Sequence, residues 1–404
     1  MLDESLFDDP DALVGADAHG LLHGVAEAGA RTRTAIRLAD DAGVTALRPD
    51  GRPRAVLVAG YGPVTHCVAD LLGAFGNGGV PVTLLRPTGA LAAPAALAWT
   101  LPGWAGPLDL LLVATPGGEE PGLETLLEQA YRRGCTVVSV TPAGTSVAEA
   151  TTQTRGLTVP LADGPVPYAP SADTAAGPGR AGSGWRTPPV VTPGTLWALL
   201  TPLLALCDRL GLLTAPPSAL QAMADRLDRT AERCGPVVDT DSNPGKTLAA
   251  ELAGALPLLW SEGPVAAAAA RHCATTFAAL AGRPALAAEL PEALDGQGAL
   301  LTGAFGAGGD ADDFFRDRVE DAESLHTRIV LLREHAPDAD SAVVTARDLA
   351  YAHDVPLSEL EPAADSGPLE AAAELIATAD FAAVYLRLAT GASAGTDPGG
   401  TSAF

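Results

Sequence analysis

The residues best placed to bind an anion lie in a glycine-containing turn between an apolar run and a helical pattern. This turn consists of Gly60, Tyr61 and Gly62, and Pro63 follows it. Exposed backbone N–H groups at the start of a helix can hold a phosphate. Pro63 has no N–H and Val64 has no hydroxyl, so an ordinary strand-to-helix turn explains the same residues equally well.

A second turn begins at Thr115 and also separates an apolar run from a helical pattern. Thr115 offers a hydroxyl, and Gly117 and Gly118 offer N–H groups that could contact a phosphate. Glu119 and Glu120 bring negative charge to the same place, and this charge opposes an anionic ligand. The turn is a candidate ligand-binding loop whose chemistry suits phosphate poorly.

The third candidate is the segment S-N-P-G-K at residues 242–246. Asn243 suits the position before a helix, and Pro244 suits the first helical position. Lys246 is the only lysine of the chain, and helix capping does not explain it. We therefore expect Lys246, beside Asn243, to have a special role, either an ion pair with Glu251 or contact with a ligand.

The histidines show no spacing typical of a metal site, so neither a metal nor another cofactor is expected. His66 and His272 fall on predicted helices, where most histidines are surface or interface residues. His335 follows a predicted strand and is the more interesting residue. The chain has no G-x-S-x-G elbow, Walker lysine loop or complete dinucleotide fingerprint, which argues against hydrolases and nucleotide-dependent enzymes.

The composition excludes several classes of partner. The 404 residues carry a formal net charge of -24, which repels nucleic acid and anionic membrane surfaces. Five cysteines without C-x-x-C spacing argue against a complete disulfide set and fit a reducing compartment. Apolar stretches are broken by Pro, Gly or charge, and the N-terminus lacks the pattern of a signal peptide. A cytoplasmic protein with neither nucleic-acid nor membrane partners is expected.

The elements that must position these residues alternate between short apolar runs and helical patterns, which predicts an α/β fold with doubly wound parallel sheets. Ligands of such sheets lie near the carboxyl ends of the strands. The apolar runs that continue this alternation are residues 54–60, 80–85, 108–114, 136–140, 255–260, 285–288, 300–305 and 328–332. The predicted helices lie within residues 11–46, 64–75, 123–133, 195–213, 219–234, 265–280, 314–319, 341–353 and 369–388.

The alternation occurs twice, which predicts two domains of the same three-layer α/β/α, flavodoxin-like kind. The first domain is expected at residues 1–160 and the second at residues 194–404. Residues 161–193 are rich in Pro, Gly, Ala and Ser and are expected to connect the two.

Two segments resemble the bifunctional phosphoglucose/phosphomannose isomerases. S-N-P-G-K-T-L-A at residues 242–249 is similar to the family's N-P-A-K-x-L-A, and A-D-F-A-A-V-Y-L at residues 379–386 is similar to its D-F-x-S-V-Y-L-A. The order of elements also agrees over most of the chain, residues 161–193 excepted. The resemblance implies two sugar-isomerase (SIS) domains, a sugar phosphate or related carbohydrate as ligand, and a homodimer.

The family interconverts aldose and ketose through an enediol, with a glutamate that moves the proton and a histidine that assists ring opening. The stretch matching the family's N-E-N-S-K, at residues 277–282, contains no acid. In the stretch matching P-E-L-N-H, which begins at Pro291, Asp295 stands in the histidine's place. The phosphate loops G-M-G-G-S and S-Y-S-G-N-T, which match residues 60–64 and 114–119, have also changed.

Three functions remain open. The first is a carbohydrate-binding protein related to glucose-6-phosphate and mannose-6-phosphate isomerases, with weak or lost catalysis, in which Asp295 contacts a sugar hydroxyl. The second is an active isomerase in which Glu292 is the base and His335, or a histidine of a second subunit, assists. The third is a structural or regulatory subunit without a ligand.

Overall fold

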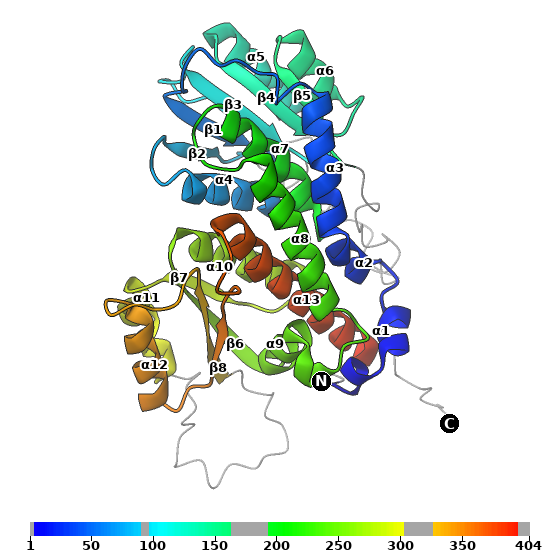
Figure 1. The fold of residues 1–404 in the computed structure, drawn as a ribbon, viewed down its shortest axis with the longest axis vertical. Coiled ribbons are helices and arrows are strands. Elements are labelled where there is room, and N and C mark those ends of the chain that lie inside the picture. Colours follow the sequence, from blue (N-terminus) through cyan, green and yellow to red (C-terminus); the bar gives the residue numbers. More distant parts are fainter. Residues whose placement is uncertain (1–3, 90–96, 163–192, 303–325, 395–404) are drawn as a thin grey trace, which may run out of the picture. The chain divides into compact units, whose positions relative to one another are not determined.

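The computed structural model describes residues 4–89, 97–162, 193–302 and 326–394 (Figure 1). It divides into two compact units. The central unit is His23–Asp228, and the terminal unit combines Met1–Leu22 with Arg229–Phe404. The terminal unit is therefore discontinuous in sequence.

The central unit contains a parallel five-stranded sheet with the order β2-β1-β3-β4-β5. This is the strand order of flavodoxin-like folds. β1 and β3 are buried along their whole length, because helices cover both faces of the sheet. The strands are β1 (Ala55–Ala59), β2 (Val82–Leu85), β3 (Asp109–Ala114), β4 (Thr136–Thr141) and β5 (Leu157–Pro160).

Helices α5 and α6 pack on one face of this sheet, where Leu57 and Leu111 of the strands meet Leu123 and Val147 of the helices. Helix α7 packs against α3 and against α4, and each of the three helices contacts the sheet. The helices of this unit are α3 (Ala28–Asp41), α4 (Pro63–Phe75), α5 (Pro121–Arg133), α6 (Ser146–Gln153) and α7 (Thr195–Arg209). Helices α2 (Leu21–Ala26) and α8 (Pro217–Arg233) cross the limits of the two units.

The terminal unit contains a parallel four-stranded sheet with the order β7-β6-β8-β9. Its apolar core joins Trp260 and Leu331 of the central strands to Ala293 of α11 and Val343 of α12. The strands are β6 (Ala255–Glu262), β7 (Leu286–Glu289), β8 (His326–Arg333) and β9 (Leu357–Leu360). The helices are α1 (Pro10–Ala16), α9 (Pro244–Leu252), α10 (Pro264–Thr276), α11 (Glu292–Gln297), α12 (Ala342–Ala352) and α13 (Pro368–Ala394), with a 3-10 helix at Glu4–Asp8.

The predicted fold class is confirmed, since both units are built on parallel sheets covered by helices. Residues 298–301 form a 3-10 helix, so the apolar run at 300–305 does not begin as a strand. The rest of that run, the predicted helix at 314–319 and most of the connecting segment lie outside the described residues. Elements α6, β5, α11 and β9 were not predicted.

The two compact units do not meet at the predicted boundaries, residues 160 and 193. Helix α7 packs on α3 and α4, so residues 195–228 are part of the central unit. The reason is that α7 is buried on nearly all sides, which requires the cover that those helices provide. No helix among the described residues is both long enough and apolar enough to cross a membrane.

Candidate ligand site at the ends of the strands

The turn after β1 is shaped by a close approach between two backbone segments. A Cβ atom on Gly60 would lie 2.0 Å from the carbonyl oxygen of Ala114, at the end of β3. The Thr65 hydroxyl donates to that same oxygen at 2.9 Å, and the half-buried Tyr61 packs on the core beneath α5. Gly62 precedes the first residue of α4. These contacts account for the turn as a strand-to-helix connection.

The loop after β3 is filled by its own side chains. The buried Thr115 hydroxyl donates to Glu120 Oε1 at 2.7 Å, and the N–H groups of Gly117 and Gly118 point to Thr115 Oγ1 at 3.3 and 3.4 Å. Glu120 is 5% exposed, directly precedes α5, and its Oε2 has no hydrogen-bond partner among the described residues. A carboxylate of the protein thus lies where the sequence suggested a phosphate.

Asn243 and Lys246, both predicted to bind ligand, are engaged within the terminal unit. Asn243 Oδ1 accepts the backbone N–H of Lys246 at 3.0 Å and thereby caps α9, as predicted. The Lys246 ammonium donates to the carbonyl oxygens of Phe7, Pro236 and Val238 at 2.6, 2.8 and 2.8 Å. All three of its N–H bonds are used in this way, and burial lowers the pKa of this lysine.

The ion pair expected between Lys246 and Glu251 is not formed. Glu251 instead lies 3.6 Å from Arg328 and accepts a hydrogen bond from Ser358 at 2.6 Å. The lysine points to the place where a carbonyl oxygen of the N-terminal 3-10 segment, at Phe7, meets those of Pro236 and Val238. Three neutral acceptors can replace the hydration of a buried ammonium without a carboxylate.

The three residues predicted to be catalytic lie near the same edge of the four-stranded sheet. Glu292 and Asp295 belong to the first turn of α11, which follows β7, and His335 follows β8 by two residues. All three side chains are exposed. Within the described residues no hydrogen bond or ion pair joins any two of them, so the structure does not assemble them into an acid–base pair.

Two glutamates that sequence reasoning missed lie at the centre of this edge. Glu334 follows β8 and accepts the N–H groups of Val265 and Ala266, at 2.5 and 3.2 Å, at the start of α10. Glu262 ends β6 and accepts the N–H of Ala342 at 2.9 Å and the hydroxyl of Ser341 at 2.8 Å, at the start of α12. Each carboxylate caps the helix that follows the other's strand.

A glutamate ends or directly follows every strand of the four-stranded sheet, and this pattern was visible in the sequence once the strands were known. The four are Glu262, Glu289, Glu334 and Glu361. Two of these carboxylates form ion pairs: Glu361 with Arg333, which is 8% exposed, and Glu289 with Arg271. In the described part of the chain, no three His, Cys, Asp or Glu side chains gather to hold a metal.

A buried histidine–carboxylate pair joins two helices of the terminal unit. His272 Nε2 of α10 lies 2.9 Å from Asp380 Oδ1 of α13 and 3.2 Å from Thr276 Oγ1. His272 and Asp380 are 9% and 3% exposed. His272 is thus an interface residue between helices. Asp380 belongs to the D-F segment that carried the family resemblance, which was the available indication of its importance.

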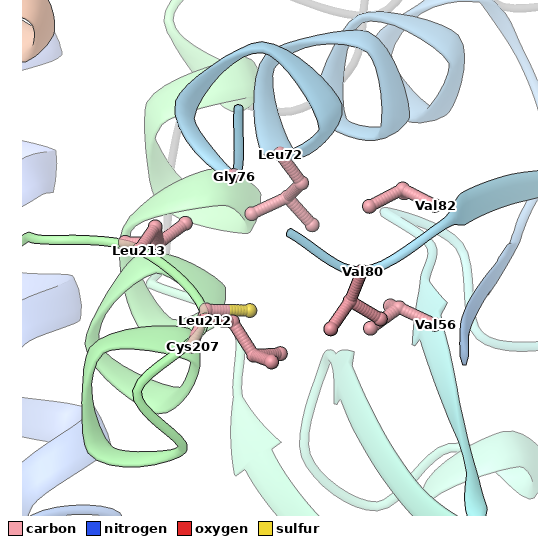
Figure 2. Close-up of a pocket in the computed structure, with 8 residues that line it drawn as sticks. All are labelled: Val56, Leu72, Gly76, Val80, Val82, Cys207, Leu212 and Leu213. Atoms are coloured by element: carbon pink, nitrogen blue, oxygen red, sulfur yellow. The ribbon is translucent and has the colours of Figure 1, made fainter. Parts of the chain in front are cut away.

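A small apolar hollow lies in the central unit between the sheet, α4 and the end of α7 (Figure 2). It is lined by Val56, Leu72, Gly76, Val80, Val82, Cys207, Leu212 and Leu213. Sugar sites need polar groups that fix the orientation of hydroxyls, and these side chains supply none. This hollow is therefore unsuited to a carbohydrate.

Comparisons with known proteins agree with the architecture. Residues 241–402 match the family model of the bacterial phospho-glucose isomerase C-terminal SIS domain. No curated protein sequence matches the chain. An inferred phosphosugar isomerase from Silicibacter pomeroyi is similar in structure over 93% of this chain and 97% of its own, with a TM-score of 0.56 and 16% identity.

Two further solved structures have the same fold. The C-terminal domain of glucosamine-fructose-6-phosphate aminotransferase from Francisella tularensis has a TM-score of 0.54 and 10% identity, over 93% of this chain and 97% of its own. Glucosamine-6-phosphate deaminase from Thermotoga maritima has a TM-score of 0.56 and 9% identity, over 93% of this chain and 95% of its own. The chain therefore has a SIS-type fold, and the match of residues 241–402 confirms its resemblance to SIS-domain phosphosugar isomerases.

Proposed function

We propose that this chain is a SIS-fold protein that binds a carbohydrate derivative without isomerising it. The observation that carries the proposal is the separation of Glu292, Asp295 and His335, which are exposed and share no hydrogen bond within the described residues. A general base must lie about 2.6–3.2 Å from the proton it removes, and a second group usually orients it. An exposed carboxylate without such a partner is not held in that way.

The stretch matching the family's glutamate segment supports the loss of catalysis. Residues 277–281 form a π-helical turn in which Phe277 and Leu280 are buried. Apolar side chains thus lie where the resemblance would place a proton-transfer group. A positioned acid or base contributes about 10²- to 10⁴-fold to a rate, so replacement of both groups leaves little isomerase activity.

The retained fold supports the ligand-binding part of the proposal. Parallel α/β sheets bind ligands beyond the carboxyl ends of their strands, and both sheets of this chain have such an edge. The SIS resemblance points to a carbohydrate derivative. A homodimer and a cytoplasmic location belong to the same proposal, and they rest on the resemblance and on the composition respectively.

A structural or regulatory subunit without a ligand is the second candidate. It is favoured by Lys246, whose three N–H bonds all serve contacts inside the protein. A screen of sugars and sugar phosphates by thermal shift separates the two candidates. A reproducible rise in Tm with one carbohydrate supports ligand binding, and no rise with any of them favours the subunit.

The catalytic part of the proposal is tested by a coupled assay that follows fructose 6-phosphate to glucose 6-phosphate and to mannose 6-phosphate. The purified protein is compared with Glu292→Ala and with a control, Glu289→Ala, which removes another exposed carboxylate nearby. We expect no turnover above background in any of the three. Turnover that Glu292→Ala abolishes and Glu289→Ala keeps would contradict the proposal and identify Glu292 as the base.

A further inference from the structure

The N-terminus of α10 binds a carboxylate of the protein itself, that of Glu334. Glu334 Oε1 accepts two successive backbone N–H groups there, from Val265 and Ala266. These are the groups with which a helix N-terminus binds a phosphate oxygen. The residue before the helix, Gly263, has a φ of 97°, and a Cβ atom on it would lie 2.3 Å from Glu334 Oε1. The backbone is thus shaped to admit this carboxylate.

The start of α12 is occupied in the same way by Glu262, through Ala342 and Ser341. β6 and β8 are neighbours in the sheet, with Glu262 paired in register with Arg333. The two occupied helix starts therefore lie side by side at the middle of the sheet's carboxyl edge. This is the place where ligands bind in parallel α/β sheets.

The surrounding charge opposes a further anion. Glu289 and Glu361 stand at the ends of the two outer strands of the same sheet. The nearby cation Arg333 is engaged, since it lies 3.5 Å from Glu359 and forms an ion pair with Glu361. A phosphate at this edge would meet several carboxylates and would have to displace one of them to reach a helix start.

The central unit also has a glutamate at a helix start, but this carboxylate accepts a hydroxyl group and no backbone N–H of the helix. Glu120 is buried at the start of α5 and takes the hydroxyl of Thr115, on the loop that the sequence marked as a candidate phosphate site. Three helix starts in two separate units thus have a glutamate where a phosphate would otherwise bind.

We propose that Glu334, Glu262 and Glu120 determine specificity by excluding phosphorylated ligands, so that the carbohydrate bound by this fold is unphosphorylated. The existence of a carbohydrate ligand rests on the function proposed above, whereas the exclusion of phosphate rests on the three carboxylates alone. A formal net charge of -24 acts in the same direction over longer distances.

The exclusion of phosphate is tested with the full chain and inorganic phosphate as the probe, by calorimetry and thermal shift. Glu334→Ala frees two N–H groups at the start of α10, and we expect it to bind phosphate at least about ten-fold tighter than the unchanged protein. The control Glu289→Ala also removes one negative charge from this edge, but it leaves every helix cap in place. This variant should bind phosphate no more tightly than the unchanged protein. Equal phosphate binding by all three proteins would overturn the proposal.

A second measurement needs no variant. Glucose and glucosamine are compared with their 6-phosphates as ligands of the unchanged protein. Tighter binding of the unphosphorylated member of a pair supports the proposal, and tighter binding of the phosphorylated member contradicts it. If neither member of any pair binds, the proposed function fails, while the phosphate titration of Glu334→Ala still decides whether the carboxylates exclude phosphate.

Discussion

Glu262 and Glu334 lie at the ends of two adjacent strands, and each carboxylate caps the helix that follows the other's strand. The two loops are therefore tied to each other by charge-assisted hydrogen bonds from both directions. Such bonds are stronger than those between neutral groups, and an anion at a helix start is favoured by the helix dipole.

Loss of one of these caps should destabilise the protein. For Glu334→Ala we expect the free energy of unfolding to fall by about 1–2 kcal/mol, because two N–H groups lose their acceptor. Urea denaturation followed by circular dichroism measures the change. Glu289→Ala breaks only an exposed ion pair with Arg271, at 2.8 Å, and should change stability by less than about 1 kcal/mol. Similar effects of both changes would show that Glu334 is not a cap.

The single lysine should be protected from chemical modification. Lys246 is 1% exposed and its ammonium donates to three carbonyl oxygens. An amine-reactive reagent should label Lys246 only after unfolding, whereas an exposed amine reacts in the native state. Peptide mass spectrometry, with and without urea, measures the labelling. Equal labelling of Lys246 in both conditions would contradict the structure.

Replacement of Lys246 should destabilise the folded protein. Lys246→Met keeps an apolar stem of similar length but leaves buried carbonyl oxygens without a donor, which costs about 1–3 kcal/mol for each group left unpaired. We expect a loss of at least about 3 kcal/mol in the free energy of unfolding, measured by chemical denaturation. A loss below about 1 kcal/mol would mean that water satisfies these carbonyl groups.

The pair formed by Arg54 and Asp109 should make stability depend on pH in acid. Arg54 donates to Asp109 from Nε at 3.1 Å and Nη2 at 2.7 Å, and these hydrogen bonds hold the pKa of Asp109 below its usual 3.8. A carboxyl group whose pKa is lowered by folding stabilises the native state above its unfolded pKa, and this contribution is lost as the pH falls through the lower folded pKa.

Asp109→Asn tests this dependence. At pH 7 we expect the variant to be about 1–2 kcal/mol less stable, since the aspartate is buried while its arginine is half exposed to solvent. Below about pH 4 the difference from the unchanged protein should shrink, because Asp109 is then protonated in the unfolded chain while the folded protein still holds it ionised. Urea unfolding at pH 7, 5 and 3 measures it. A difference that stays constant over this range would show that the charge of Asp109 is not responsible.

The stability of the protein should depend more on the hydroxyl group of Thr115 than on the shape of its side chain. Thr115→Val keeps the branched side chain but removes the donor to Glu120 Oε1, a buried carboxylate oxygen, and should cost about 1–3 kcal/mol. Thr115→Ser keeps the hydroxyl donor and should lower the free energy of unfolding by less. Denaturant unfolding of the pair gives the comparison, and the assignment fails if serine is the more damaging replacement.

The sequence predicted the central strands well because their composition leaves few alternatives. β1 and β3 are continuous apolar runs, buried throughout, and such runs between helical patterns are typical of parallel sheets. The cap of α9 by Asn243 also follows from local chemistry. Strand β9, Leu357–Leu360, was missed because it is four residues long and contains a serine and a glutamate. Edge strands of this kind have no distinctive pattern.

The site was predicted only in outline, because its contacts join distant parts of the chain. Glu334 reaches a helix start 69 residues away, and His272 reaches Asp380 over 108 residues. Nothing local distinguishes these side chains from exposed ones. The same applies to Lys246. The sequence shows that it is the only lysine, but not that it donates to the carbonyl oxygen of Phe7, 239 residues away.

The bond from Lys246 to Phe7 also bears on the order of events during synthesis. The terminal unit takes its first segment from the beginning of the chain, where Phe7 packs edge to face on Tyr385 at 6.1 Å between ring centroids. On the ribosome this segment emerges before the central unit, and its partners in the terminal unit emerge after it. The central unit, which is continuous in sequence, is completed in between. Domains fold as units, so the inner part of the chain matures before the part that encloses it in sequence.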